Sequence, residues 1–365
     1  MGTAMDMLRL VPRGGPAILN VSVTNHCNAT CDFCNFAHDK GFVTDRRFMD
    51  ADRFPEALRV MHEQAQVRFV TFMGGEPLLH KRILEMSRVA RDMGVQPTLV
   101  TNGWLLPQRL EALAEAGLTT LFISVDSEDA AKHESNRGLK GVVERIRGAA
   151  RRLSALGVAP VASVAMTRLI GDYAALGRFL RELGFEAVTF SYPRKAALGS
   201  SSLVYSEEST LVDMGRDELL RAFDGAEAMR AIIPVQNPRA GMEDMRRRLT
   251  GEGERYVCHA GYKYFYLDWN HELWRCEDWS SSMGPVFDFT PEKFVRDGCQ
   301  ACSTDCYRDA SLMLHLPVAI GDAFAALREG RPAAAFRAVA DGRAWGSLRA
   351  VMEQGKRIRS LAGAG

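Results

Sequence analysis

The chain has 365 residues, of which 47% are hydrophobic and 25% charged, and its 46 basic and 45 acidic residues give a formal net charge of +1. This balance is typical of a globular protein and points neither to nucleic acid nor to an anionic membrane. No run of about 18 apolar residues and no signal-peptide pattern occurs, so we expect a cytoplasmic protein that is not integral to a membrane.

Short, β-branched apolar runs alternate with amphipathic stretches over roughly the first half of the chain. The runs are 17–23, 68–73, 97–101, 119–125, 160–165 and 186–192, and the helical stretches are 51–66, 81–93, 107–116, 141–156 and 172–183. Alternation of this kind predicts a parallel sheet with crossover helices. Because six units fall short of the eight in a closed barrel, we predict an α/β fold with a partial, TIM-like (β/α)6 barrel.

The pattern changes after Pro193. We expect a Gly/Ser linker at 199–202, helices at 207–230 and 242–249, an aromatic, cysteine-rich region at 256–307 and a helical tail from Leu316. The predicted division is a barrel domain at 1–195, a linker with helical connection at 196–255, a small cysteine-rich extension at 256–310 and the helical tail at 311–365.

Three of the eight cysteines, Cys27, Cys31 and Cys34, form a C-x3-C-x2-C loop directly after the first predicted strand. That is the end of a parallel α/β sheet where active sites are found. Three thiolates can hold three corners of an iron–sulfur cubane and leave the fourth iron open to a ligand. The alternative is a zinc loop, although structural zinc normally takes four protein ligands.

The other five cysteines lie far along the chain, at Cys258, Cys276, Cys299, Cys302 and Cys306. The run 264–269, a turn at 270–271 and the return at 273–276 predict a β-hairpin bracketed by cysteines. In a large chain without secretion signals, such cysteines indicate metal ligands or redox groups rather than disulfides. Iron–sulfur and structural zinc sites both remain open, and we expect His259, His271 and His315 to be ordinary polar residues.

The first cysteine loop, with Phe33 before its last cysteine, resembles the signature of the radical S-adenosylmethionine (SAM) superfamily. The resemblance implies a [4Fe-4S] cluster on Cys27, Cys31 and Cys34, with SAM chelating the open iron. An electron from the cluster then cleaves the sulfonium and releases a 5'-deoxyadenosyl radical.

Four further stretches support this resemblance and imply SAM-binding residues. Gly74, Gly75, Glu76 and Pro77 resemble the GGEP motif, and Asn102 lies in a TNG element at the end of the third strand. Ser124 and Asp126 match a family position that contacts SAM or substrate, but Ser127 stands where glycine is usual. Arg137 lies in a stretch similar to H-[DE]-x-x-R-G, and it faces the SAM carboxylate or caps a helix. Gly74 to Pro77 and Asn102–Gly103 also read as plain turns.

The C-terminal cysteines resemble the twitch form of the SPASM extension, which binds an auxiliary iron–sulfur cluster. The resemblance implies a second [4Fe-4S] cluster. Four irons need at most four cysteine ligands, so at least one of the five cysteines is spare. Alternatively, one iron has no cysteine ligand and is open for substrate. Our first choice of ligands is Cys258, Cys276, Cys299 and Cys302, with Cys306 as the competitor.

The resemblance therefore implies a SAM-cleaving enzyme whose radical acts on an unactivated carbon of a small molecule, lipid or peptide. A flavodoxin or ferredoxin is the expected electron donor. A looser likeness, in the Cys299–Cys306 pattern, to adenosyltransferases that act on hopanoid alkenes leaves radical addition open. Peptide maturation is another alternative, and a redox sensor or cluster carrier is the non-enzymatic one. The sequence assigns no catalytic acid or base and no single substrate.

Overall fold

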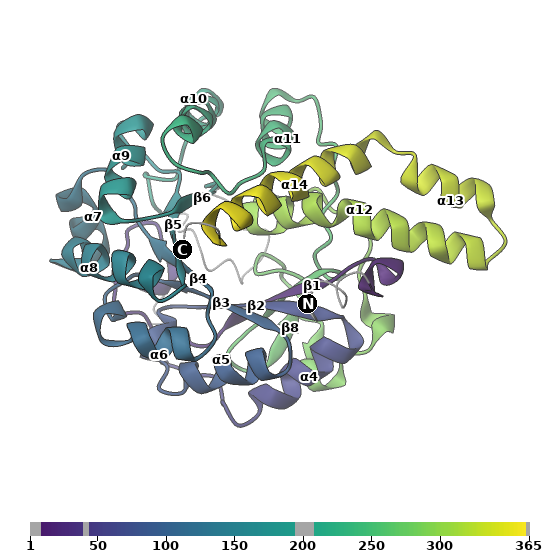
Figure 1. Ribbon diagram of the computed structural model, residues 1–365, viewed down its shortest axis with the longest axis horizontal. Helices are drawn as coiled ribbons and strands as arrows, with labels where there is room; N and C mark the ends of the chain where they lie inside the picture. The colour runs from purple at the N-terminus through teal and green to yellow at the C-terminus, as the bar shows by residue number, and fades with distance from the viewer. Residues whose placement is uncertain (1–8, 39–43, 194–207, 363–365) are drawn as a thin grey trace.

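In the computed structural model, residues 9–38, 44–193 and 208–362 are described, with side chains to residue 354. Six parallel strands form the core sheet, in the order β6-β5-β4-β3-β2-β1 (Figure 1). Their bounds are Ala17–Ser22 (β1), Val67–Met73 (β2), Gln96–Thr101 (β3), Thr120–Ser124 (β4), Ala159–Ala165 (β5) and Ala187–Ser191 (β6). These are the six runs predicted from the sequence, so the partial barrel is confirmed.

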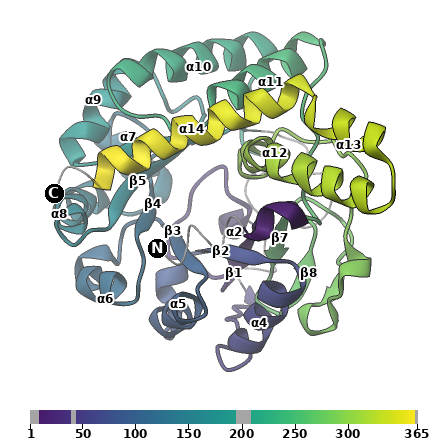
Figure 2. The same ribbon diagram turned by 45° about the vertical axis from the view of Figure 1, so that its right-hand side comes forward.

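Helices cover the outer face of this curved sheet, as Figure 2 shows. They are α4 (Phe54–Gln64), α5 (Ile83–Asp92), α6 (Leu110–Glu115), α7 (Ala130–Arg137), α8 (Val142–Ala155) and α9 (Tyr173–Leu183). Strand residues in the helix-packed core, such as Leu121 and Ile123, are fully buried, whereas the alternate positions Thr120, Phe122 and Ser124 stay partly exposed. The inner face of the sheet is therefore not filled as the interior of a closed barrel is.

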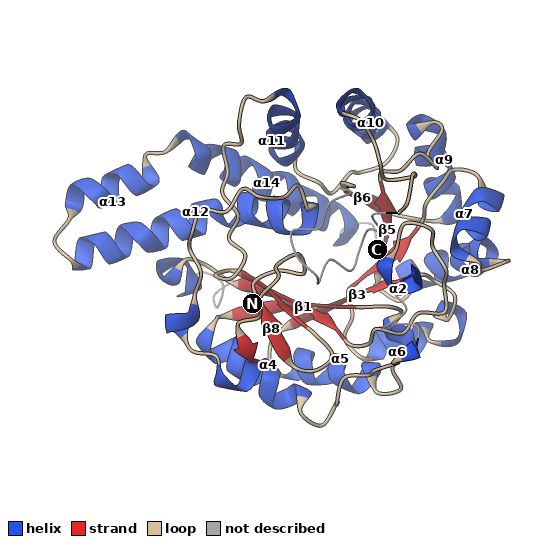
Figure 3. Ribbon diagram, turned by 180° about the vertical axis from the view of Figure 1, so that it is seen from behind, coloured by secondary structure: helices blue, strands red, loops and turns tan. Residues whose placement is uncertain are grey.

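A second group of strands continues the same sheet beyond β1. Strand β7 (Tyr264–Leu267) pairs in parallel with β1, and β8 (Glu272–Trp274) and β9 (Gly284–Pro285) follow in antiparallel order (red in Figure 3). The predicted hairpin is thus present as β7 and β8. The sequence did not predict its pairing with β1, because nothing local in a strand identifies its neighbour.

Helices α10 (Arg216–Ala228) and α11 (Arg239–Thr250) connect the barrel to this second group. The prediction of helix from residue 207 was wrong at its start: residues 208–215 form turns, and Val212 packs on Phe33. Glu218 accepts a hydrogen bond from the Gly215 amide, which fixes the beginning of α10. The expected linker at 199–202 lies outside the described residues.

Helix α12 (Asp305–Arg328) closes the open side of the partial barrel and begins well before the predicted tail at Leu316. On one side, Tyr307 packs on Tyr264 of β7 with ring centroids 4.5 Å apart. On the other, Asp309 accepts a hydrogen bond from Asn237, which also donates to the Phe190 carbonyl of β6. The first turns of α12 are buried nearly all round, so they lack the amphipathic period by which a helix is recognised.

The tail continues with α13 (Pro332–Val339) and α14 (Gly342–Ala362). Within the described residues, α12 alone is long and apolar enough to cross a membrane by length and composition, and half of its apolar window is buried inside the protein. The domain limits at 195, 255 and 310 stay a prediction.

Candidate functional site

The first cysteine loop follows β1 and is held by backbone contacts from other elements. The Thr30 amide donates to the Arg137 carbonyl at 2.9 Å, and the Cys34 amide donates to the Cys31 carbonyl at 3.1 Å. Cys31 is buried, whereas Cys27 and Cys34 are partly exposed. The loop is thus fixed at the carboxyl end of the sheet, where the sequence placed it.

Gly74 and Gly75 let the end of β2 approach this loop closely. The Gly75 amide donates to the Thr24 carbonyl and the Glu76 amide to the His26 carbonyl, both at 2.9 Å. A Cβ added at Gly75 would lie 2.1 Å from the His26 oxygen, and one at Gly74, whose φ is +128°, 2.3 Å from the Thr24 oxygen. The two glycines thus let the end of this strand approach the backbone of the cysteine loop.

Glu76 is fully buried and ties the ends of β2 and β3 together. Its carboxylate accepts hydrogen bonds from the Thr101 hydroxyl and the Asn102 amide, both at 2.8 Å, and from the Leu78 amide at 3.0 Å. Burial raises the pKa of Glu76 to about 7, although the three hydrogen-bond donors each lower this pKa. Pro77 follows as the first residue of a short 3-10 helix, Pro77–Leu79.

Asn102 extends this connection to the cysteines. Its side-chain amide donates to Asn28 Oδ1 at 2.8 Å and lies 3.9 Å from Cys27 Sγ. The turn dipeptide Asn102–Gly103 therefore forms part of the support of the loop. Asn28, which the sequence did not single out, is its direct partner.

Asp126 and Arg137 form a buried, two-pronged ion pair at 2.8 and 2.6 Å. Burial alone would raise the pKa of the Asp126 carboxyl, but the Arg137 guanidinium outweighs this and holds that pKa well below its usual range. His133 accepts from the Asp126 amide, and Asn136 bridges the Asp126 carboxylate to the Asp32 amide. Arg137 is thus not a surface residue, because its guanidinium is buried and paired with Asp126.

Ser124 and Ser127 lie on either side of Asp126. Ser124 is a partly exposed residue on the inner face of β4, within the open barrel. Ser127 is fully buried, and its hydroxyl donates to the Leu169 carbonyl at 2.9 Å, so serine takes a defined structural place where glycine is usual in the family.

The three thiols of the first loop lie close enough to influence each other. Burial, with a smaller contribution from Cys31, raises the pKa of Cys27 to about 12 and also raises that of Cys34. Such thiols become thiolates only beside a strong positive charge, which an iron–sulfur cluster supplies. No three His, Cys, Asp or Glu side chains of the described residues converge tightly enough for a single metal ion. The donor set fits a cluster that spreads its thiolates over several irons.

The structure brings the five C-terminal cysteines together from three segments. Cys258 donates its amide to the Cys299 carbonyl at 2.9 Å, and both pack in one buried cluster with Cys276 and Cys306. Burial, with a smaller contribution from Cys302, raises the pKa of Cys258 to about 11. All five thus remain candidate ligands.

Two acidic residues beside these cysteines were not identified from the sequence. Glu277 is buried, and its Oε1 lies 4.0 Å from Cys306 Sγ. Its main-chain amide donates to the Tyr307 hydroxyl at 3.0 Å. Burial raises the pKa of Asp305 to about 7, while Ser191 at the end of β6 donates to its carboxylate. Only their adjacency to Cys276 and Cys306 could have indicated them.

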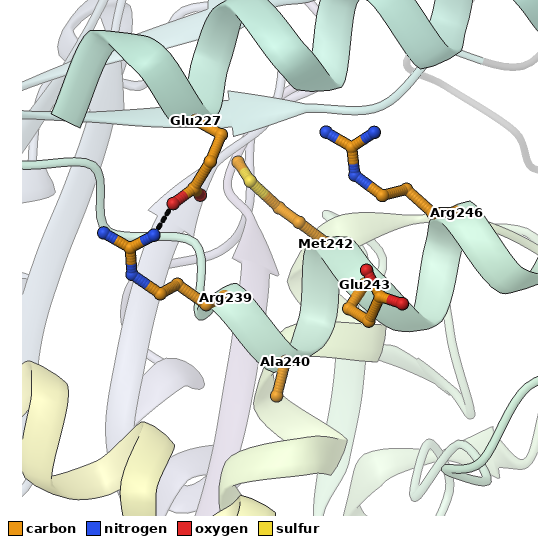
Figure 4. Close-up of a pocket in the computed structure, with 6 residues that line it drawn as sticks. All are labelled: Glu227, Arg239, Ala240, Met242, Glu243 and Arg246. Carbon is orange, nitrogen blue, oxygen red and sulfur yellow. Dashed lines mark ion pairs between the residues drawn. The ribbon is translucent and has the colours of Figure 1, made fainter.

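Aromatic side chains link the two cysteine groups. Phe36, just after Cys34, packs with Tyr266 of β7 and with Trp269 and Trp274 of the hairpin. Both groups therefore flank one hairpin. A separate hollow of about 330 Å³ lies between α10 and α11, crossed by a Glu227–Arg239 ion pair, and contains none of the predicted site residues (Figure 4).

Comparison with known proteins agrees with this geometry. Residues 21–172 match the model of the Radical SAM superfamily. A probable GTP 3',8-cyclase from Pyrococcus horikoshii is 33% identical over 141 residues, which are 38% of this chain and 44% of that protein. A GTP 3',8-cyclase from Rhodococcus opacus is 28% identical over 279 residues, 69% of this chain and 78% of that protein. The match thus spans less than half the length of the Pyrococcus relative.

Solved structures extend the likeness in fold to the C-terminal region. Streptococcus suis SuiB bound to its precursor peptide SuiA superposes with a TM-score of 0.59 at 15% identity, covering 81% of this chain and 69% of SuiB. The curved parallel sheet with a three-cysteine loop at its carboxyl end defines the class of protein. Residues 21–172 match a Radical SAM superfamily domain, so the expected resemblance is confirmed for this part of the chain.

Proposed function

We propose that the chain is an enzyme that reductively cleaves SAM to methionine and a 5'-deoxyadenosyl radical, which then acts on an unactivated carbon. The observation that carries this proposal is the loop of Cys27, Cys31 and Cys34 at the carboxyl end of β1. Burial raises the pKa of both Cys27 and Cys34 in this loop, and Arg137 acts in the opposite direction. When bound, a [4Fe-4S] cluster supplies the electron that cleaves the sulfonium.

The surrounding residues have separate tasks in this proposal. Cys27, Cys31 and Cys34 hold the cluster, and Gly74 and Gly75 keep the loop within hydrogen-bonding distance of β2. Gly74 to Pro77, Asn102, Ser124, Asp126 and Arg137 bind SAM or orient the groups that do. Glu76 and Arg137 are each tied to protein partners, so their contribution includes positioning of the loop.

The C-terminal cysteines would hold an auxiliary [4Fe-4S] cluster that accepts an electron or anchors the substrate. Burial of Cys258 and its packing with Cys276, Cys299 and Cys306 support this role. The first choice of ligands is Cys258, Cys276, Cys299 and Cys302, with Cys306 as the competitor.

The substrate is a small molecule, a lipid or a peptide. A flavodoxin or ferredoxin supplies the electron for SAM cleavage, and the reaction takes place in the cytoplasm. The relatives named for GTP cyclisation favour a small molecule, and SuiB, solved with a precursor peptide, favours a peptide. Radical addition to an isoprenoid alkene is a further possible outcome for the same radical.

The test is anaerobic incubation of the reduced, reconstituted protein with SAM, followed by quantification of 5'-deoxyadenosine. The wild type should form it, and the Cys27→Ala/Cys31→Ala/Cys34→Ala variant should form none. Absence of 5'-deoxyadenosine from the wild type under several strong reductants would favour a redox sensor or cluster carrier instead. If the triple variant still contains about four irons and four sulfides per chain, the C-terminal cysteines hold a second cubane.

A further inference from the structure

The hairpin of α12 and α13 buries small side chains and exposes large ones. Ala323, Ala326 and Ala335 are between 5% and 8% exposed and form its packed seam, which Ala334 and Ala338 flank. Large apolar residues on the same two helices point outward instead: Phe324 is 43% exposed, Leu327 55%, Phe336 71% and Val339 39%. This reverses the usual order, in which a helix turns its largest apolar residues toward the protein.

The exposed residues are concentrated in one part of the molecule. Of the eight exposed large hydrophobic residues in the described part of the chain, seven lie on α12, α13 and α14, including Trp345 at 67%. Phe324 and Leu327 are three residues apart, as are Phe336 and Val339, so each pair occupies one side of its helix. Single exposed apolar residues need no explanation, but a grouped set marks an interaction surface.

The charge of the same segment identifies the kind of partner. Residues 323–349 contain five arginines, Arg328, Arg331, Arg337, Arg343 and Arg349, against two carboxylates, Glu329 and Asp341. The local balance is +3 (5 − 2), whereas the whole chain has a net charge of only +1. Exposed Phe and Trp side chains combined with arginines on short helices are typical of segments that lie in the surface of an anionic bilayer.

The position of the hairpin allows such contact. Figures 1 and 3 show α13 and the adjacent end of α12 projecting beyond the barrel, away from the sheet. Half of the apolar window of α12 is buried inside the protein, so this helix is placed to rest on a membrane rather than to cross it. We propose that the α12–α13 hairpin and the first turn of α14 dock the protein on an anionic lipid surface.

Co-sedimentation of the full chain with vesicles tests this proposal. The protein should pellet with vesicles of phosphatidylcholine and phosphatidylglycerol, pellet much less with phosphatidylcholine alone, and be released in part by high salt. The double variant Phe336→Ser/Trp345→Ser should weaken binding by about tenfold or more. Phe48→Ser is the matched control, because Phe48 is 45% exposed and lies outside these helices.

A second pair of variants tests the charge. Arg337→Glu should reduce binding to the anionic vesicles, whereas Arg59→Glu on α4 should leave it unchanged. All five replaced side chains are exposed, so circular dichroism and thermal melting should match the wild type. The proposal is overturned by absence of binding to the anionic vesicles, by an equal loss in Phe48→Ser, or by concentration-dependent self-association that Phe336→Ser/Trp345→Ser abolishes.

Discussion

The two cysteine groups of this protein are built in different ways. The first comes from one loop of eight residues, and the rest of the barrel holds that loop from outside through Gly75, Asn102 and Arg137. The second is assembled from segments at Cys258, at Cys276 and at Cys299 to Cys306, which meet only because β7 pairs with β1 and α12 closes the barrel. One group is local in sequence and the other depends on the whole fold.

This difference determines where each group is vulnerable. The first loop should fail when a close backbone approach is blocked, because its support consists of short contacts to main-chain atoms. The second should tolerate small local changes but should fail when its own ligands are removed. The two should also be separable, since they are supported by different elements.

The largest expected effect is from Gly75→Ala. The added methyl group would lie 2.1 Å from the His26 carbonyl oxygen, so the loop that carries Cys27 has to move. We expect loss of the first cluster and a fall of 5'-deoxyadenosine formation by at least about a hundredfold, equal to a loss of about 2.7 kcal/mol or more in transition-state stabilisation. Iron content and 5'-deoxyadenosine are the measurements.

Gly148→Ala provides the matched control. Gly148 lies on the exposed side of α8, and a Cβ there would meet no atom within 4 Å. Alanine should stabilise this helix by up to about 1 kcal/mol and leave iron content unchanged. Equal activity in the two alanine variants would refute the role assigned to the close approach at Gly75.

Removing ligands of the second group should have a smaller, separable effect. In Cys276→Ser/Cys302→Ser, iron should fall from about eight to about four per chain. Formation of 5'-deoxyadenosine should persist, because SAM cleavage requires only the first loop. Loss of both iron pools in this variant would show that the two groups are not independent. The corresponding change in the first loop is the triple alanine variant described above.

The sequence predicted the first of these two regions more completely than the second, for a physical reason. The six strands, the first loop and the GGEP and TNG turns were predicted, since short β-branched apolar runs, cysteine spacing and Gly-rich strand ends are local patterns. The sequence missed the pairing of β7 with β1, the early start of α12, and the acidic neighbours Glu277 and Asp305. Those depend on which segments meet in space, and the all-round burial of the first turns of α12 hides their helical period.

The support of the first loop can also be tested by stability. Arg137→Gln leaves the Asp126 carboxylate buried without its guanidinium partner, which should cost about 3–5 kcal/mol in the free energy of unfolding. Arg152→Gln removes an exposed pair with Glu111 and should cost less than about 1 kcal/mol. Urea unfolding of the cluster-free protein measures both. Similar costs for the two variants would contradict a supporting role for the Asp126–Arg137 pair.

A pH-dependent effect is expected in the second region, at the beginning of β7. Lys263 is 1% exposed, and its ammonium group donates to the Arg13 and Gly15 carbonyls and to Gln66 Oε1 at 2.8 to 3.0 Å. Burial, with a smaller contribution from the charge of Arg296, lowers the pKa of Lys263 to about 7. The unfolded chain keeps this proton up to about pH 10.4, so between these values it binds more protons than the folded protein does.

Stability of the wild type should therefore rise with pH across that window, relative to Lys263→Met, in which the group is absent. The difference between the two unfolding free energies should grow by up to about 1.4 kcal/mol per pH unit above pH 7 and should stay constant below it. Taking the difference cancels the titration of the cysteines, which both proteins share. Lys140→Met, at an exposed site, should show no such growth. A constant difference from about pH 7 to 9 would mean that Lys263 keeps its charge in the fold, stabilised by its three oxygen partners.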